Sequence, residues 1–344
     1  MTSINRKTDL RGNSLGKGVD IGTAFISCAE QNGDKVMFRN ERDAFFEVQY
    51  TKFTKNMLNK AGVRYIKKGD HLYVVGNSAL EFANLFHKDT RRPLSRGVIN
   101  PAEKESLPMI EVLIAGIVGK PRVTGEVAYF SVPGAPIDAD FNSIYHEKVL
   151  QKFLGKLGYD AFPINEGQAV VLSELHDEGF SGLGLSFGGG MVNACLSYMS
   201  VPCFSFSVTK AGDWIDQQVA MATNETTSQI CAVKESSLNL STDIAKDNTE
   251  DALSIYYNYL IEYVLENIKE AFENSKDRPN LNNPIPIVLA GGTTKPQGFA
   301  TRFTRLMKQT KLPFPVSSVR MAREPLKSVA KGALVAARAH GEED

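Results

Sequence analysis

The chain has 344 residues, of which 42% are hydrophobic and 23% are charged. This length is sufficient for two domains with a large buried core, and the composition is that of an ordinary globular protein. The 39 basic and 39 acidic side chains give a formal net charge of zero, so we expect no nucleic-acid partner and no attraction to an anionic membrane.

Cysteine usage and the N-terminal residues predict a cytoplasmic protein. No stretch of about twenty apolar residues is present. Residues 1–17 are polar and contain glycine, and we expect a flexible tail and no amphipathic membrane anchor. The cysteines lack the C-x-x-C spacing of zinc or redox sites and are expected to be buried free thiols in a reducing compartment. They are Cys28, Cys195, Cys203 and Cys231.

The first ordered segment is expected to begin near Val19 and to end in a phosphate-binding turn. Asp20 lies on a predicted strand shortly before Gly22 and Thr23. A carboxylate beside a small-residue turn suits a magnesium ion held through water, and the amides of such a turn can approach phosphate oxygens. A strand-end aspartate that caps its own turn explains the same residues equally well.

Alternating strand and helix patterns follow in the first half of the chain. Residues 45–86 predict short strands with one helix, and residues 91–99 form an arginine-bearing loop for which solvation is favoured over a basic contact patch. The order of strand, helix and strand that comes next predicts a parallel α/β unit. Its predicted elements are a helix over 106–119, a strand over 126–132, a helix over 144–157 and a strand over 159–164.

Glu166 is placed at the N-terminal end of the next predicted helix. Two roles fit a glutamate at this position. It either complements the helix dipole or faces a phosphate site and orients a water molecule. The residue alone does not decide between these roles.

The stretch from Leu185 to Leu196, LSFGGGMVNACL, predicts two strands joined by three glycines. A turn without side chains lets the backbone N–H groups of Gly188, Gly189 and Gly190 close on a bound anion. A plain hairpin with a glycine-rich turn is the alternative for this segment taken alone.

Two further glycine turns lie at strand ends in the second half of the chain. A predicted strand over 204–208 leads through Gly212 and Asp213 into a helix, an arrangement that receives anions, although Asp213 also fits a simple N-cap. Residues 223–251 predict a small polar helical region, and the long helix after it is expected to place its tyrosines in the core and on the flanks of the helix, not in a stacking platform. A buried strand then ends at Gly291 and Gly292.

Taken together, these segments resemble the motifs of the actin, Hsp70 and hexokinase ATPase superfamily, and within it those of bacterial actins of the MreB and MamK type. The resemblance covers nearly all of the chain after the tail. The matching segments are VDIGT (19–23, first phosphate motif), RPLSRGVI (92–99), NEGQAVVL (165–172, connecting motif), FGGGMVNACL (187–196, second phosphate motif), VTKAGDWID (208–216, with Ala211 in place of a glycine), VLAGGTT (288–294, adenosine motif) and EPLKSVAKGAL (324–334).

The resemblance implies an α/β fold of two lobes, each a ribonuclease-H-like mixed sheet flanked by helices, with a nucleotide cleft between them. The implied division has four parts. Residues 1–17 form the tail, residues 18–178 form lobe I with a small subdomain at about 35–98, residues 179–325 form lobe II with a small subdomain at about 217–277, and the C-terminal helix 326–344 completes lobe I.

The resemblance also implies roles for single residues in binding ATP or ADP with Mg²⁺. Asp20 would hold the magnesium ion through water, and Glu166 would orient the attacking water molecule. The implied nucleotide-binding residues are Gly22, Thr23, Ser186, Gly188, Gly189, Gly190, Gly212, Asp213, Gly291, Gly292 and Thr293.

Two residues depart from the family's second phosphate motif, D-x-G-G-G-T. Ser186 replaces the aspartate and carries no negative charge to order the magnesium shell, and Met191 replaces the threonine and offers no hydroxyl to phosphate. Loss of one positioned polar group at such a site can lower the rate by about 10²-fold or more. We therefore expect slow or altered ATP hydrolysis, with nucleotide binding less affected.

The resemblance thus implies a cytoplasmic, actin-like cytoskeletal protein that polymerises into filaments for scaffolding or positioning, with cargo or adaptor proteins as further partners. A net charge of zero does not oppose such self-association. The alternative is a non-polymerising, Hsp70-like or pilus-type adaptor that uses nucleotide as a switch. A sugar or acid kinase would need a catalytic base near the cleft, for which Asp138 and Asp140 are the candidates.

Overall fold

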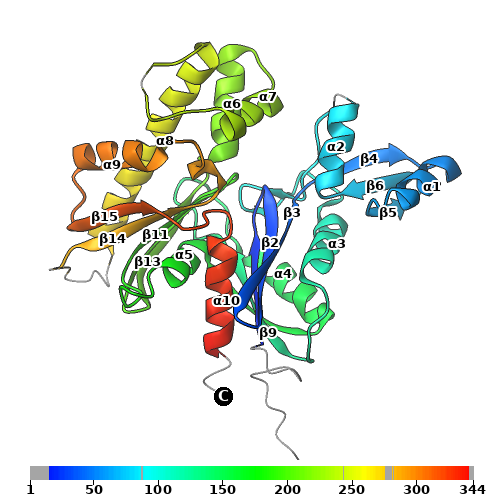
Figure 1. Ribbon diagram of the computed structural model, residues 1–344, viewed down its shortest axis with the longest axis horizontal. Coiled ribbons are helices and arrows are strands. Elements are labelled where there is room, and N and C mark those ends of the chain that lie inside the picture. The colour runs from blue at the N-terminus through cyan, green and yellow to red at the C-terminus, as the bar shows by residue number, and fades with distance from the viewer. Residues whose placement is uncertain (1–14, 87, 243, 276–280, 282, 341–344) are drawn as a thin grey trace, which may run out of the picture.

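The computed structural model describes residues 15–86, 88–242, 244–275, 281 and 283–340. They form two lobes, and each lobe is built on a five-stranded mixed sheet (Figure 1). Lobe I contains the blue strands at the right of Figure 1, and lobe II contains the green to orange strands at the left. The two-lobed α/β fold predicted from the sequence is confirmed.

The sheet of lobe I has the strand order β10-β9-β1-β2-β3. Strands β1, β2 and β3 pair antiparallel, β9 pairs with β1 in parallel, and β10 pairs with β9 in parallel. The parallel pairing of β9 with β10, across a helical connection, is the predicted α/β unit. The strands are β1 (Lys17–Ile21), β2 (Phe25–Asn32), β3 (Lys35–Arg42), β9 (Glu126–Val132) and β10 (Tyr159–Asn165).

The sheet of lobe II repeats this topology with the order β13-β12-β11-β14-β15. Again three consecutive strands pair antiparallel and two later strands add in parallel. Because both sheets have the same order, β1 and β11 hold equivalent central positions. The strands are β11 (Gly182–Phe187), β12 (Val192–Tyr198), β13 (Val201–Val208), β14 (Ile285–Ala290) and β15 (Val316–Met321).

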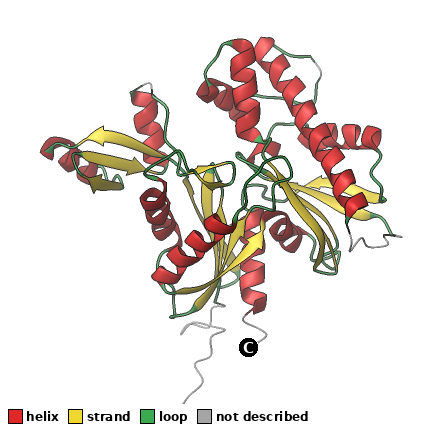
Figure 2. Cartoon of the chain, turned by 180° about the vertical axis from the view of Figure 1, so that it is seen from behind, coloured by secondary structure: helices red, strands yellow, loops and turns green. Residues whose placement is uncertain are grey.

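Helices cover both faces of each sheet (Figure 2). In lobe I, α3 packs on β2 and β3 and α4 packs on β9 and β10, while in lobe II α8 packs on β13 and α9 on β15. The remaining faces are covered by α5 and α10, which also pack against each other. These helices are α3 (Ser106–Val118), α4 (Ile144–Leu157), α5 (Glu166–Glu174), α8 (Asn248–Asn274), α9 (Phe299–Thr310) and α10 (Ser328–His340).

The α5–α10 pair joins the two lobes at the centre of the molecule. Helix α10 contacts β1 and β9 of lobe I. Helix α5 contacts β11 and β12 of lobe II, although the predicted division at residue 179 assigns it to lobe I. The helices approach so closely that a Cβ atom on Gly332 would lie 1.8 Å from the Ala169 carbonyl oxygen. On the other side of α10, a Cβ atom on Gly18 would lie 2.1 Å from the Ala330 carbonyl oxygen. Glycine is therefore required at both contacts.

Two small subdomains extend from the lobes, at the upper right and the top of Figure 1. The first has a three-stranded sheet in the order β4-β6-β5, with two helices and a short two-stranded sheet beyond it. The second is helical. Their elements are β4 (Phe45–Gln49), α1 (Lys52–Lys60), β5 (Tyr65–Lys68), β6 (His71–Val75), α2 (Asn77–Leu85), β7 (Leu94–Ser95) and β8 (Val98–Ile99) in the first, and α6 (Gly212–Thr223) and α7 (Thr227–Ser236) in the second.

The structure differs from the predicted elements in three places. The sequence predicts one helix between residues 45 and 86, but α1 is a second one, begun by the side chain of Thr51, which accepts a hydrogen bond from the Thr54 N–H. Leu58 is the one buried residue of α1, so no apolar stripe marks this helix. Strand β15 was not predicted either, and β1 begins at Lys17, inside the predicted tail. Residues 1–14 of that tail lie outside the described residues.

The cysteines and the membrane expectation can be placed on this fold. All four thiols are free, and Cys28 and Cys195 are buried as predicted. The prediction of burial is wrong for Cys203 and Cys231, which are partly exposed. In the described part of the chain, no helix combines the length and apolar character needed to cross a membrane.

Candidate functional site

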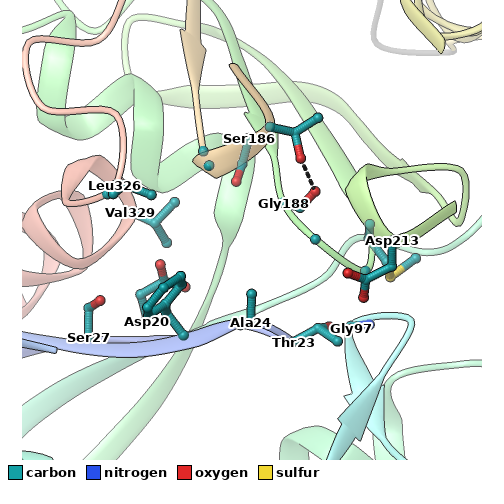
Figure 3. A pocket seen from close by; sticks show the side chains of 18 of the residues that line it. Asp20, Thr23, Ala24, Ser27, Gly97, Ser186, Gly188, Asp213, Leu326 and Val329 are labelled. Carbon is teal, nitrogen blue, oxygen red and sulfur yellow. Dashed lines mark hydrogen bonds between the residues drawn. The ribbon is translucent and has the colours of Figure 1, made fainter. Parts of the chain in front are cut away.

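A pocket lies between the lobes, lined by the turns at the ends of β1, β11 and β14 and by the first residues of α6 (Figure 3). The equivalent positions of β1 and β11 bring the first two turns face to face. The pocket collects every predicted site residue except Gly212. Those that line it are Asp20, Gly22, Thr23, Glu166, Ser186, Gly188, Gly189, Gly190, Asp213, Gly291, Gly292 and Thr293.

Asp20 is held on β1 by a hydroxyl from the neighbouring strand. Ser131 Oγ donates to Asp20 Oδ1 over 3.0 Å and accepts a hydrogen bond of 2.9 Å from the Ile21 N–H. Burial raises the pKa of Asp20 above its usual range, and the hydrogen bond from Ser131 opposes this rise. A half-buried carboxylate that accepts one hydrogen bond from the described residues suits a cation in the pocket that would stabilise its charge.

The turn at residues 188–190 has backbone N–H groups available for an anion. The Gly188 N–H closes the turn by donating to the Met191 carbonyl oxygen over 2.9 Å. The N–H groups of Gly189 and Gly190 donate to no acceptor within the described residues. Gly190 is buried and Gly189 half-buried. Because buried N–H groups are nearly always paired in proteins, this turn fits a ligand that supplies the acceptor.

Among these glycines, Gly190 is the one most strictly required for space. None of the three has a positive φ. A Cβ atom on Gly190 would lie 2.3 Å from Thr23 Oγ1 and 2.8 Å from the Gly97 nitrogen. The glycine turn of lobe II therefore packs directly against the first turn of lobe I, and a side chain at this position would push the two apart.

Glu166 points into the pocket from the first turn of α5. The Asn165 side chain caps this helix by accepting from the N–H groups of Gly167 and Gln168, so the Glu166 carboxylate is not needed as the cap. Instead, Glu166 Oε2 accepts a hydrogen bond of 2.9 Å from Ser186 Oγ. Burial, and then the nearby Asp20 charge, raise the pKa of Glu166.

Gly212 supports the pocket from behind. Its N–H and that of Asp213 donate to the carbonyl oxygens of Gly188 and Gly189, over 3.2 and 2.7 Å. A Cβ atom on Gly212 would lie 2.5 Å from Thr293 Oγ1. The start of α6 thus holds the glycine turn of β11 in place, and Gly212 does so without lining the pocket.

The third turn is fixed against β11. Gly291 has a φ of 95°, and a Cβ atom there would lie 2.2 Å from the Phe187 carbonyl oxygen, so both the conformation and the contact need glycine. Thr293 Oγ1 donates to the Gly188 carbonyl oxygen over 2.8 Å (Figure 3). The turns after β11 and β14 therefore form one unit.

The arginine-bearing loop contacts lobe II, so the prediction that it is merely solvated is wrong for Arg92. Arg92 Nη1 donates to both carboxylate oxygens of Asp213, over 3.0 and 3.1 Å. In the same loop, the Gly97 N–H donates to Thr23 Oγ1 over 3.0 Å. Arg92 lines the pocket, and its pairing with Asp213 joins the two lobes beside the glycine turn.

Two further polar contacts join lobe I and its small subdomain to the small subdomain of lobe II. Arg42 lies 3.5 Å from Glu235, and Ser228 Oγ donates to Asp89 over 2.8 Å. Together with the pair at Arg92, these contacts bring the subdomains together over the pocket. They are polar and at least partly exposed, so their separation has a small free-energy cost.

Sequence reasoning missed several pocket residues from the second subdomain. Lys234 of α7 donates to the Gly212 carbonyl oxygen and to Asp216 Oδ2, over 3.0 and 2.6 Å, and so connects α7 to the start of α6. No glycine motif marks these residues, and α7 is a polar helix recognisable mainly by its capping box at Thr226. The missed pocket residues are Asp216, Cys231, Lys234 and Glu235.

The candidate bases of a sugar or acid kinase do not reach the pocket. The Asp138 carboxylate accepts two bonds from the Thr209 N–H, of 2.9 and 3.0 Å, and one from the Tyr263 hydroxyl. Neither Asp138 nor Asp140 lines the pocket. Asp138 instead fixes the end of β13, which leaves the kinase hypothesis without its base.

Asp43, beside the pocket, makes the stability of the chain depend on pH. Its Oδ2 accepts from the Leu94 N–H over 3.1 Å, and its buried Oδ1 has no partner among the described residues. Burial raises the pKa of Asp43 from 3.8 to about 8. The folded state therefore favours the protonated acid, and the free energy of unfolding falls as pH rises between these values, by up to about 1.4 kcal/mol per pH unit.

We expect Asp43→Asn to remove this contribution, since asparagine can still accept from Leu94 without carrying charge. The measurement is urea unfolding at pH 6 and pH 8 of the wild type, this variant and the exposed-turn control Asp34→Asn. The free energy of unfolding of Asp43→Asn, relative to that of the wild type, should rise from pH 6 to pH 8. The free energy of the control Asp34→Asn should change with pH as that of the wild type does. An equal change in the free energy of unfolding between pH 6 and pH 8 in all three proteins would show that Asp43 does not cause the pH dependence.

Comparison with known proteins identifies the fold. A family model described as Volactin matches residues 15–337, whereas no curated protein matches the chain. The solved structure titled "MamK double helical filament" is 20% identical, with 94% of this chain and 98% of that chain covered and a TM-score of 0.69. MreB5 of Spiroplasma citri bound to AMPPNP is 15% identical, with 95% and 97% covered and a TM-score of 0.67.

A third similar structure is the ethanolamine utilization protein EutJ from Carboxydothermus hydrogenoformans. It is 13% identical, with 93% of this chain and 89% of that chain covered and a TM-score of 0.51. Identities this low establish a common fold only. The predicted resemblance to the actin-like superfamily is confirmed at the level of the fold.

Proposed function

Because the chain belongs to the volactin family and shares the fold of MamK and MreB5, we propose that it binds ATP with magnesium and polymerises into actin-like filaments. One observation carries the nucleotide proposal. Glycine turns from both lobes meet at a pocket where the N–H groups of Gly189 and Gly190 have no acceptor among the described residues and the carboxylates of Asp20 and Glu166 stand nearby. This combination fits a phosphate chain with a divalent cation.

Different pocket residues bind the phosphates, the nucleoside and the magnesium ion. Gly22, Thr23, Gly189 and Gly190 surround the phosphates, and the turn at residues 291–293 lies beside the nucleoside. Asp20 holds the magnesium ion through water. Magnesium commonly binds one or two carboxylates together with substrate phosphates, and when bound it neutralises phosphate charge. No larger cluster of metal-binding side chains occurs in the described residues, which is compatible with such a site.

We further propose that hydrolysis is slow. Glu166 acts on the attacking water, but its carboxylate is shared with the Ser186 hydroxyl, where an aspartate would add a second negative charge. Met191 is buried, and a Cβ atom on Gly97 would lie 2.5 Å from its sulfur. This packing supports a role for Met191 in positioning the loop at residues 92–99 in place of a hydroxyl contact to phosphate.

Filament formation in the cytoplasm is the larger part of the proposal. Support comes from the shared fold with a protein whose structure is a double helical filament and from the net charge of zero, which leaves self-association unopposed. Such a filament would serve as a scaffold or position a cargo through further partners.

Nucleotide titration and light scattering test the two parts separately. A fluorescent ATP analogue should bind with Mg²⁺, and ATP should produce a rise in scattering that increases with protein concentration. Binding without any rise in scattering would contradict polymerisation and favour the nucleotide-switch adaptor. Absence of binding would contradict the proposal at its first step.

A further inference from the structure

Ser186 combines features that are not needed for holding a nucleotide. It is the fifth of the six residues of β11, two positions before the glycine turn, and only 3% of its surface is exposed. Its side chain lines the pocket that contains Asp20 (Figure 3). Its oxygen donates to Glu166 Oε2 over 2.9 Å. A hydroxyl and a carboxylate at this distance form the pair of nucleophile and base that covalent catalysis uses.

Two other hydroxyls of the pocket, those of Thr23 and Thr293, are engaged in the fold. Thr23 Oγ1 accepts from the Gly97 N–H, and Thr293 Oγ1 donates to the Gly188 carbonyl oxygen. Ser27 lies opposite Asp20 in the pairing of β1 with β2. Among the pocket hydroxyls of the described residues, Ser186 alone donates to a carboxylate. Ser186 is thus the hydroxyl with a base in place.

We propose that Ser186 is a phosphoryl acceptor, so that the chain transfers the γ-phosphoryl group of its bound nucleoside triphosphate to its own Ser186 oxygen. This inference rests on the proposed nucleotide site. A bond forms between Ser186 Oγ and the γ-phosphorus as the bond from that phosphorus to the β-bridging oxygen breaks. Glu166 takes the hydroxyl proton and later releases it to solvent, and the nucleoside diphosphate leaves. Water competes for the same phosphoryl group.

The product would change the pocket. Phosphoserine carries a charge of about −1.5 to −2 at neutral pH, and at position 186 it would stand beside Glu166 and near Asp20. It would occupy space otherwise available to a third phosphate and repel the two carboxylates. A phosphorylated subunit would therefore bind nucleoside triphosphate more weakly, and each chain would undergo the transfer once.

The test uses the full-length chain incubated with Mg-ATP and followed by intact mass and fragment spectra. We expect a time-dependent gain of one phosphoryl group located at Ser186. Ser186→Ala should abolish the gain, whereas the matched control Ser27→Ala, another buried hydroxyl of the same pocket, should retain it. Glu166→Gln should slow the gain by about 10²- to 10⁴-fold, the range typical of a lost general base.

Fragment spectra of the wild-type chain show whether Ser186 carries the phosphoryl group, even where a variant fails to fold. A chain that binds the fluorescent nucleotide but carries no phosphate at Ser186 would overturn this inference and leave the proposed function standing. A gain that persists in Ser186→Ala would overturn it as well. A chain that binds no nucleotide would remove both the inference and the nucleotide site on which it rests.

Discussion

Replacing Glu166 with glutamine should lower the rate of ATP hydrolysis by about 10²-fold or more, the loss typical of a removed general base, while nucleotide affinity stays within about threefold. Glutamine keeps the size of the side chain and an oxygen that can accept from Ser186, so the pocket keeps its shape. It cannot take a proton from water. Phosphate release at saturating ATP and titration with a fluorescent nucleotide measure the two quantities.

Glu111→Gln is the control for this experiment. Glu111 lies on α3 and pairs at the surface with Lys156, away from the pocket, so both rate and affinity should match the wild type. Equal losses of rate and affinity in Glu166→Gln would assign Glu166 to binding. An unchanged rate would mean that it takes no part in hydrolysis.

Gly332→Ala should destabilise the chain by about 3 kcal/mol, because overpacking a close contact costs about this much. The added methyl group would lie 1.8 Å from the Ala169 carbonyl oxygen. This oxygen belongs to the backbone of α5 and cannot rotate away as a side chain can. The helices must separate, and α5 carries Glu166. We therefore expect a loss of hydrolysis together with the loss of stability, measured by urea unfolding and by phosphate release.

Gly155→Ala provides the matched comparison. Gly155 lies in α4 and has an ordinary φ, and beyond the adjoining helix backbone no atom of the described residues lies within 4 Å of a Cβ built on it. Alanine there should raise the free energy of unfolding by up to about 1 kcal/mol through helix propensity. If both variants had the same midpoint of urea unfolding as the wild type, the close packing of α5 and α10 would not limit the stability of the chain.

The fold was predictable where hydrophobic periodicity and caps agree. Residues 144–157 form a helix with the predicted bounds, because Gly158 ends α4 in the left-handed conformation. Helix α1 and strand β15 were missed for a physical reason, since both are largely exposed and bury few side chains. The packing of α5 on lobe II was also hidden, because it depends on contacts between residues far apart in the chain.

The sequence predicted those parts of the pocket that are formed by glycine turns at strand ends. Gly190 meets the turn after β1 because β1 and β11 hold equivalent positions in two sheets of the same order, and Gly291 lies beside them because β14 pairs with β11 in parallel. Arg92 and Lys234 carry no such signal, since a loop arginine and a lysine on a polar helix are ordinary surface residues. Only the tertiary structure brings them to Asp213 and Gly212.

Electron microscopy of the purified full-length chain, with and without Mg-ATP, tests the central claim most directly. We expect filaments in ATP at micromolar protein, and few or none without nucleotide, because the cleft contacts at Arg92 and Arg42 would close in a fixed geometry around the ligand. A chain that binds ATP yet forms no filaments at any salt or protein concentration would contradict the claim.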